Sequence, residues 1–99
     1  MMSESTDSNG KVILAIKGDF DTNAAPKIDG KLSECVNRTD DLVLDFKDVS
    51  YVSSAGLRVI LKIQKAMEEK NGRITFINVC DEVLDVFEYA GFLSILTIE

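Results

Sequence analysis

The feature that most limits the fold is a repeated change in the spacing of apolar residues along the 99-residue chain. Four runs have the β-branched, aromatic and apolar composition of strands: 12–16, 41–46, 73–79 and 93–98. Three stretches between them carry apolar residues at every third or fourth position, the spacing of one helical face: 25–36, 57–67 and 83–90. Strands that alternate with helices predict an α/β layer with a largely parallel sheet.

Local residues predict where the helices begin and end. Pro26 fits the first turn of the first helix, where its missing N–H is not needed, and Thr22 or Asn23 is available as its cap. Asp81 is the expected cap of the third helix, and Gly91 its end. The stretch 49–52 either extends the second strand or forms a separate one.

The length fits one domain, and the charge limits the partners. Residues 1–10 are polar, which predicts either a flexible start or a weak edge strand before a domain of residues 11–99. The 17 acidic and 11 basic side chains give a net charge of −6. This excess of carboxylates argues against direct nucleic-acid binding and favours a partner with a basic patch.

Several other classes of function lack the residues they need. The chain has no histidine, and its two cysteines, Cys35 and Cys80, do not form a C-x-x-C pair, so we expect no metal, no cofactor and two buried, reduced thiols. No apolar run approaches the roughly 18 residues of a membrane helix, and no signal peptide is visible, so we expect a cytoplasmic protein without membrane contact.

The serines of "DVSYVSSAGLRVIL", residues 48–61, stand where an apolar run gives way to a helix. Ser53 or Ser54 can cap that helix by accepting an N–H of its first turn. A helix N-terminus also suits a phosphate, which could arrive by phosphorylation of a serine in the loop. Neither serine has a base for nucleophilic catalysis, so we expect no enzyme. This loop and the loop 18–23 both follow strands, where α/β proteins gather their ligands and partners.

Two segments resemble the STAS domain family, in particular its small standalone bacterial anti-sigma factor antagonists. "LDFKDVSYVSSAGLRVIL", residues 44–61, is similar to the central signature of the family, and "GDFDTNAAPKI", residues 18–28, to its first-strand exit. The resemblance covers residues 11–98. It implies a single-domain STAS-like α/β fold over 11–99, with a mixed, mostly parallel sheet of four to five strands and about three to four helices.

The resemblance also implies a phosphorylation switch. In the family, the unphosphorylated antagonist binds an anti-sigma factor that is also an ATP-dependent serine kinase, which frees a sigma factor. Phosphorylation at the N-terminus of the second helix abolishes binding, and a metal-dependent serine/threonine phosphatase restores it. Matched by position, the phosphorylated serine is Ser54. The implied partner surface comprises Asp21, Ser53, Ser54, Gly56 and Leu57.

The sequence departs from the family pattern at two positions and leaves a second function open. Ser53 replaces an acid and is therefore a competing phosphosite, and Ala55 replaces a hydroxyl residue. We expect Asp19 and Asp21 to lie near Ser54. The basic residues of the second helix are expected to solvate its outer face: Arg58, Lys62, Lys65 and Lys70. The alternative function is a STAS scaffold subunit of a stressosome-like signalling complex or of a lipid-transport complex.

Overall fold

The computed structural model describes residues 2–99 as a mixed sheet with helices packed on it. The strands are β1 (Met2–Thr6), β2 (Val12–Lys17), β3 (Asp41–Asp48) and β4 (Arg73–Ile77). The helices are α1 (Ala25–Arg38), α2 (Ser54–Glu69) and α3 (Asp81–Tyr89). The sheet order is β1-β2-β3-β4, with β1 antiparallel to β2 and the other neighbours parallel. The expected α/β class with a mixed, mostly parallel sheet is confirmed.

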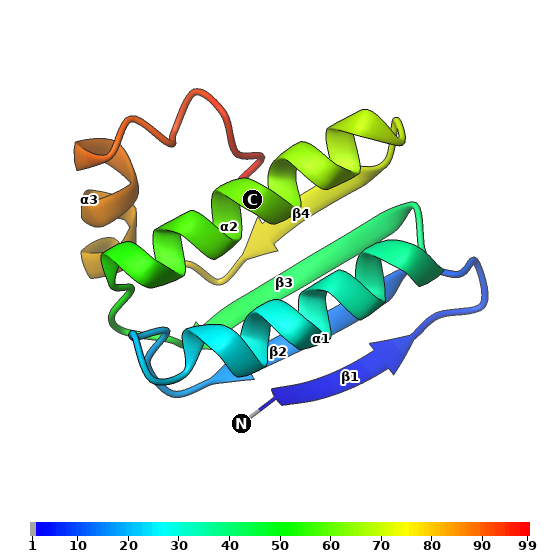
Figure 1. The fold of residues 1–99 in the computed structure, drawn as a ribbon, viewed down its shortest axis with the longest axis horizontal. Helices are drawn as coiled ribbons and strands as arrows, with labels where there is room; N and C mark the ends of the chain where they lie inside the picture. The colour runs from blue at the N-terminus through cyan, green and yellow to red at the C-terminus, as the bar shows by residue number, and fades with distance from the viewer. Residues whose placement is uncertain (1) are drawn as a thin grey trace.

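Helices α1 and α2 lie side by side over the same face of the sheet, α1 nearer β2 and α2 nearer β4 (Figure 1). The core lies between these layers because alternate strand residues point to the helices. The buried strand residues are Val12, Leu14, Ile16, Leu42, Leu44, Phe46, Ile74 and Phe76. Helix α3 lies at the end of the sheet where the parallel strands finish (Figure 1), and its Phe87 ring packs against Phe46 and Phe76.

The N-terminal residues form the edge strand β1 and are tied to α1 by charge. Glu4 lies in register with Leu14, on the helix side of the sheet. Its carboxylate accepts two hydrogen bonds from Arg38, at 3.1 and 2.9 Å, and pairs with Lys31 at 2.7 Å. These contacts lower the pKa of Glu4 from 4.5 to about 2, mainly through the Arg38 hydrogen bond.

The prediction of a strand at 93–98 is wrong. Gly91, with φ of 78°, ends α3, and the N–H groups of Ile95 and Leu96 both donate to the carbonyl of Phe92, so the chain turns there. Only Ile98 forms a bridge to the sheet, opposite Phe76. The strand-forming composition of this segment does not produce a strand, because two of its N–H groups donate to the nearby carbonyl of Phe92 and not to a neighbouring strand.

Two of the expected helix caps are also wrong. Ala24, and neither Thr22 nor Asn23, occupies the N-cap position of α1, and it makes no side-chain cap bond. Helix α3 begins at Asp81 and its N-cap is Cys80. The neighbouring expectation that Pro26 lies in the first turn of α1 is confirmed.

Lys70 departs from the solvated role expected of the basic residues of α2. Its ammonium group donates to the carbonyls of Val36 and Thr39 at the end of α1, and lies 3.1 Å from the carboxylate of Asp40. These carbonyls have no partner within their own helix, and a cation is favoured at this end of the helix dipole. Lys70 therefore fixes the end of α1 against the end of α2.

Candidate functional site

The two loops that follow β2 and β3 are bonded into one unit at the carboxyl ends of the parallel strands. Phe20 and Val52 form an isolated parallel bridge. The N–H of Phe20 donates to the carbonyl of Tyr51, and the N–H of Ser53 donates to the carbonyl of Phe20, each at 2.9 Å. The stretch 49–52 is therefore neither an extension of β3 nor a separate full strand, but the partner of the first loop. Phe20 is fully buried, which fixes both loops to the core.

Gly56 lets the first turn of α2 approach this unit. A Cβ at position 56 would lie 2.6 Å from the carbonyl oxygen of Phe20, and 2.9 Å from a methyl carbon of Val52. Ordinary van der Waals contact begins at about 3.4 Å, so glycine alone fits without movement. Gly56 thus has a packing role beneath the site and is itself buried.

The two serines are in different environments although they are adjacent. Ser53 is the N-cap of α2, is 7% exposed, and its hydroxyl oxygen accepts the N–H of Gly56 at 3.2 Å. Ser54 is the first residue of α2 and is exposed. The sequence left open which serine caps the helix, and the structure assigns the cap to Ser53.

The first loop, 18–23, carries two acidic side chains. Asp21 is half-buried, and its carboxylate accepts the N–H of Ala24 at 2.9 Å, so it prepares the start of α1. Asp19 is exposed and accepts the hydroxyl of Ser50 from the second loop at 3.1 Å. The carboxylate-bearing first loop is thus held against the loop that leads to Ser54.

Leu57 completes the predicted set and lies at the edge of the core. It is half-buried and packs against the core cluster, as Ala55 does. Of the residues the resemblance implied, Ser54 is the exposed one, whereas Ser53 and Gly56 are buried. Phe20 and the Asp19–Ser50 contact were not predicted as site features. The apolar residue between two acids in "GDFD" was the available signal for Phe20.

The exposed polar residues of the two loops include Ser54 and Asp19. The sequence contains no histidine. Within residues 2–99, no group of three or more metal-ligating side chains is brought together.

Both cysteines are free. Cys35 is buried, as predicted, but Cys80 is only half-buried, so the prediction of two buried thiols is wrong for Cys80. Burial raises the pKa of the Cys35 thiol. No helix in the described part of the chain is long and apolar enough to cross a bilayer.

Comparison with known proteins gives the family of this chain. Residues 2–99 match the STAS domain family, and the chain belongs to it. Within the family it is homologous to anti-sigma factor antagonists. It is 30% identical over 83 residues to the anti-sigma-B factor antagonist of Bacillus subtilis, covering 84% of this chain and 76% of that protein. It is 32% identical over 91 residues to BtrV of Bordetella bronchiseptica, covering 91% of this chain and 78% of that protein.

Solved structures share the fold at lower identity. The antagonist SpoIIAA in its unphosphorylated form gives a TM-score of 0.77 at 18% identity, covering 100% of this chain and 87% of that chain. An anti-sigma factor antagonist from Mycobacterium paratuberculosis gives 0.86 at 16% identity, covering 99% of this chain and 83% of that chain. Antagonists of this family are regulators and not enzymes.

Proposed function

We propose that this chain is an anti-sigma factor antagonist whose binding is switched by phosphorylation of Ser54. The unmodified protein binds an anti-sigma factor that is also an ATP-dependent serine kinase, and so frees a sigma factor in the cytoplasm. The kinase transfers a phosphoryl group to Ser54 and binding is lost. A metal-dependent serine/threonine phosphatase removes the group. The observation that carries the proposal is the exposed hydroxyl of Ser54 beside the buried, bonded hydroxyl of Ser53.

The difference in burial supports Ser54, and not Ser53, as the phosphorylated serine. A kinase must reach the hydroxyl oxygen, and the oxygen of Ser53 lies under the first turn of α2, bonded to the N–H of Gly56. To present Ser53, the helix start would have to open and give up a cap worth roughly 1 kcal/mol. Ser54 needs no such opening because it is exposed on the first residue of the helix.

A phosphate on Ser54 is compatible with the fold. The N-terminus of α2 carries the positive end of the helix dipole, and a negative group there stabilises a helix by roughly 0.3–1 kcal/mol. Phosphorylation adds about −1.5 to −2 charges. These charges would lie on the same surface as the acidic first loop with Asp19 and Asp21. The proposed switch therefore changes the surface and leaves the helix in place.

The remaining residues of the implied partner surface have distinct roles in this proposal. Ser53 and Gly56 set the position of the helix start through the cap bond and the close contact with Phe20. Leu57 is half-buried and offers the apolar part of the contact. Asp21 holds the first loop and contributes negative charge, which suits a basic patch on the partner.

The proposal is tested by capture and phosphosite mapping. Unmodified chain is used as bait in an extract of its own organism, and the captured protein is identified and purified. An anti-sigma factor with kinase activity supports the proposal; subunits of a stressosome-like or lipid-transport complex would favour the scaffold alternative. The bait is then incubated with the captured kinase and ATP, and its mass is measured.

Matched variants of the two serines complete the experiment. We expect one phosphoryl group on the natural chain and on Ser53→Ala, and none on Ser54→Ala, which should still bind the kinase. Phosphate on Ser54→Ala, or equal binding of modified and unmodified chains, would contradict the switch.

A further inference from the structure

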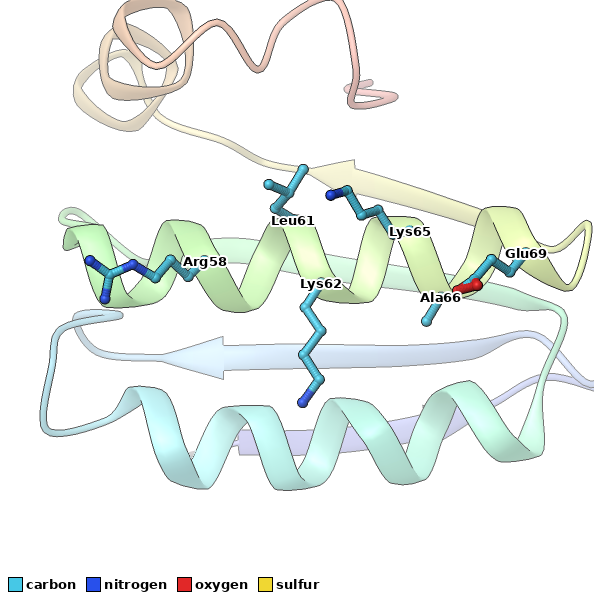
Figure 2. A pocket seen from close by; sticks show the side chains of 6 residues that line it. All are labelled: Arg58, Leu61, Lys62, Lys65, Ala66 and Glu69. Carbon is cyan, nitrogen blue, oxygen red and sulfur yellow. The ribbon is translucent and has the colours of Figure 1, made fainter.

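The outer face of α2 carries a groove that the proposed function does not use. It has a volume of about 550 Å³ and is lined by residues of this one helix: Arg58, Leu61, Lys62, Lys65, Ala66 and Glu69. Figure 2 shows Leu61 and Lys65 along one side of the helix and Lys62 reaching from the other side toward α1. We propose that this groove is a docking surface for an acidic amphipathic helix of a partner protein.

The charge of the groove is the first reason to expect an acidic partner there. The chain as a whole has 17 acidic and 11 basic side chains, but the groove has three cations and Glu69 as its only acid. A basic groove on an acidic protein attracts negative segments locally, while the rest of the surface repels them. The position of the attractive patch then determines where an acidic partner binds.

Some cations of the groove form no ion pair within the described part of the chain. Lys62 is bonded to the carboxylate of Asp29 on α1, at 2.9 and 3.1 Å. Within residues 2–99, neither Arg58 nor Lys65 has an ion-pair partner, and both are exposed. Two cations spaced two helical turns apart are thus available to a partner.

The length of the groove suits a helix as its occupant. Positions 58–69 extend along α2 for about 17 Å at the rise of an α-helix. Half-buried Leu61 and Ala66 supply apolar contacts between the charged side chains. An amphipathic helix binds such a groove with apolar residues at intervals of three and four and with charges on either side. Acids beside those apolar residues would meet Arg58 and Lys65.

A protein segment fits this charge distribution better than a membrane or a nucleic acid. Both of those present extended arrays of phosphates, which would also face the acidic remainder of the chain. A single helix covers only the basic groove. The proposal does not depend on phosphorylation of Ser54, because none of the groove residues belongs to the two loops.

The test is a titration of the full ¹⁵N-labelled chain with a synthetic helical peptide. The peptide has leucines at every third or fourth position and glutamates on both sides of them. We expect amide shifts concentrated in 58–69 and an affinity that falls as salt is raised. The same peptide with lysines in place of the glutamates should not bind.

Two double variants with the same change in net charge separate the groove from general electrostatics. Arg58→Gln with Lys65→Gln should weaken binding roughly five- to tenfold, as expected for two exposed ion pairs. Lys11→Gln with Arg73→Gln removes two cations from the uncovered face of the sheet and should change affinity less than about twofold.

Three results would overturn the proposal. One is the absence of peptide-induced shifts in 58–69. Another is an equal loss of affinity in both double variants. The third is binding of phosphatidylglycerol vesicles or a short DNA duplex at 58–69 when the acidic peptide does not bind. Circular dichroism of each variant checks that the exposed substitutions leave the fold intact.

Discussion

Gly56→Ala tests the close contact that places Ser54. The added methyl group would lie 2.6 Å from the carbonyl oxygen of Phe20 and 2.9 Å from side-chain carbons of Phe20 and Val52. Contact distances must grow by nearly 1 Å, and the nearest atom is backbone, so it cannot turn away. Either α2 or the bonded pair of loops has to move.

The size of the effect follows from three contributions. Forcing extra volume into a packed region costs roughly 1–3 kcal/mol. Displacing the carbonyl of Phe20 also weakens the 2.9 Å hydrogen bond from Ser53, a bond worth about 1 kcal/mol. Alanine recovers up to about 1 kcal/mol of helix propensity. We expect a net loss of about 2 kcal/mol, or roughly 10 °C in Tm for a domain of this size.

Urea denaturation followed by circular dichroism measures this loss, and Gly30→Ala is the matched control. Gly30 lies in α1, and nothing lies within 4 Å of where its Cβ would be. The control should gain about 0.5–1 kcal/mol from its lower unfolded-state entropy and higher propensity. The same substitution is therefore expected to lower the free energy of unfolding at position 56 and to raise it at position 30. A stabilising Gly56→Ala would refute the close-contact argument.

Two further predictions concern the cap and the edge strand. Ser53→Ala removes the acceptor of the Gly56 N–H and should lower the free energy of unfolding by about 1 kcal/mol. Ser54→Ala, at an exposed position, should change it by less than about 0.5 kcal/mol, and equal losses in urea denaturation would contradict the cap assignment. Glu4→Gln should lower stability at pH 7. Because the pKa of Glu4 is lowered from 4.5 in ordinary surroundings to about 2 in the folded chain, its contribution is complete above pH 4.5 and is lost as pH falls toward 2. Thermal denaturation over this range should show the natural chain and Glu4→Gln converging near pH 2; parallel curves would argue against the ion pairs.

The order of strands and helices was predictable because apolar spacing reports directly which face of each element is buried. The residues of α1 predicted to share one face, among them Ile28, Leu32 and Cys35, are buried in the structure. The same argument failed for 93–98 because composition does not show that the backbone of this segment forms a turn bonded to its own carbonyl at Phe92. There, the turn at Phe92 leaves only Ile98 opposite β4.

The helix starts were less predictable because several residues offer the same chemistry. Asp21, Thr22 and Asn23 can all accept an N–H at the start of α1. In the structure the carboxylate of Asp21 accepts the N–H of Ala24, and Asp21 is held there by the neighbouring Phe20, which pairs with the second loop. Sequence reasoning placed both loops at one edge of the sheet. It did not identify Phe20 as the residue that joins them: the apolar residue in "GDFD" was visible, but its backbone hydrogen bonds are with distant positions, 51 and 53, which the local pattern does not show.

The hydrogen bonds of this junction constrain how the proposed phosphate on Ser54 would act. Residues 20 and 51–53 are joined by backbone hydrogen bonds above a fully buried ring, and the helix start is capped by Ser53. A dianion added at Ser54 therefore remains where it is formed, favoured by the helix N-terminus. Tenfold weaker binding requires only about 1.4 kcal/mol. Burying an unmatched dianion against a partner costs several times that amount. A large change in affinity is thus attainable from charge at the contact alone, because neither the loops nor α2 needs to move.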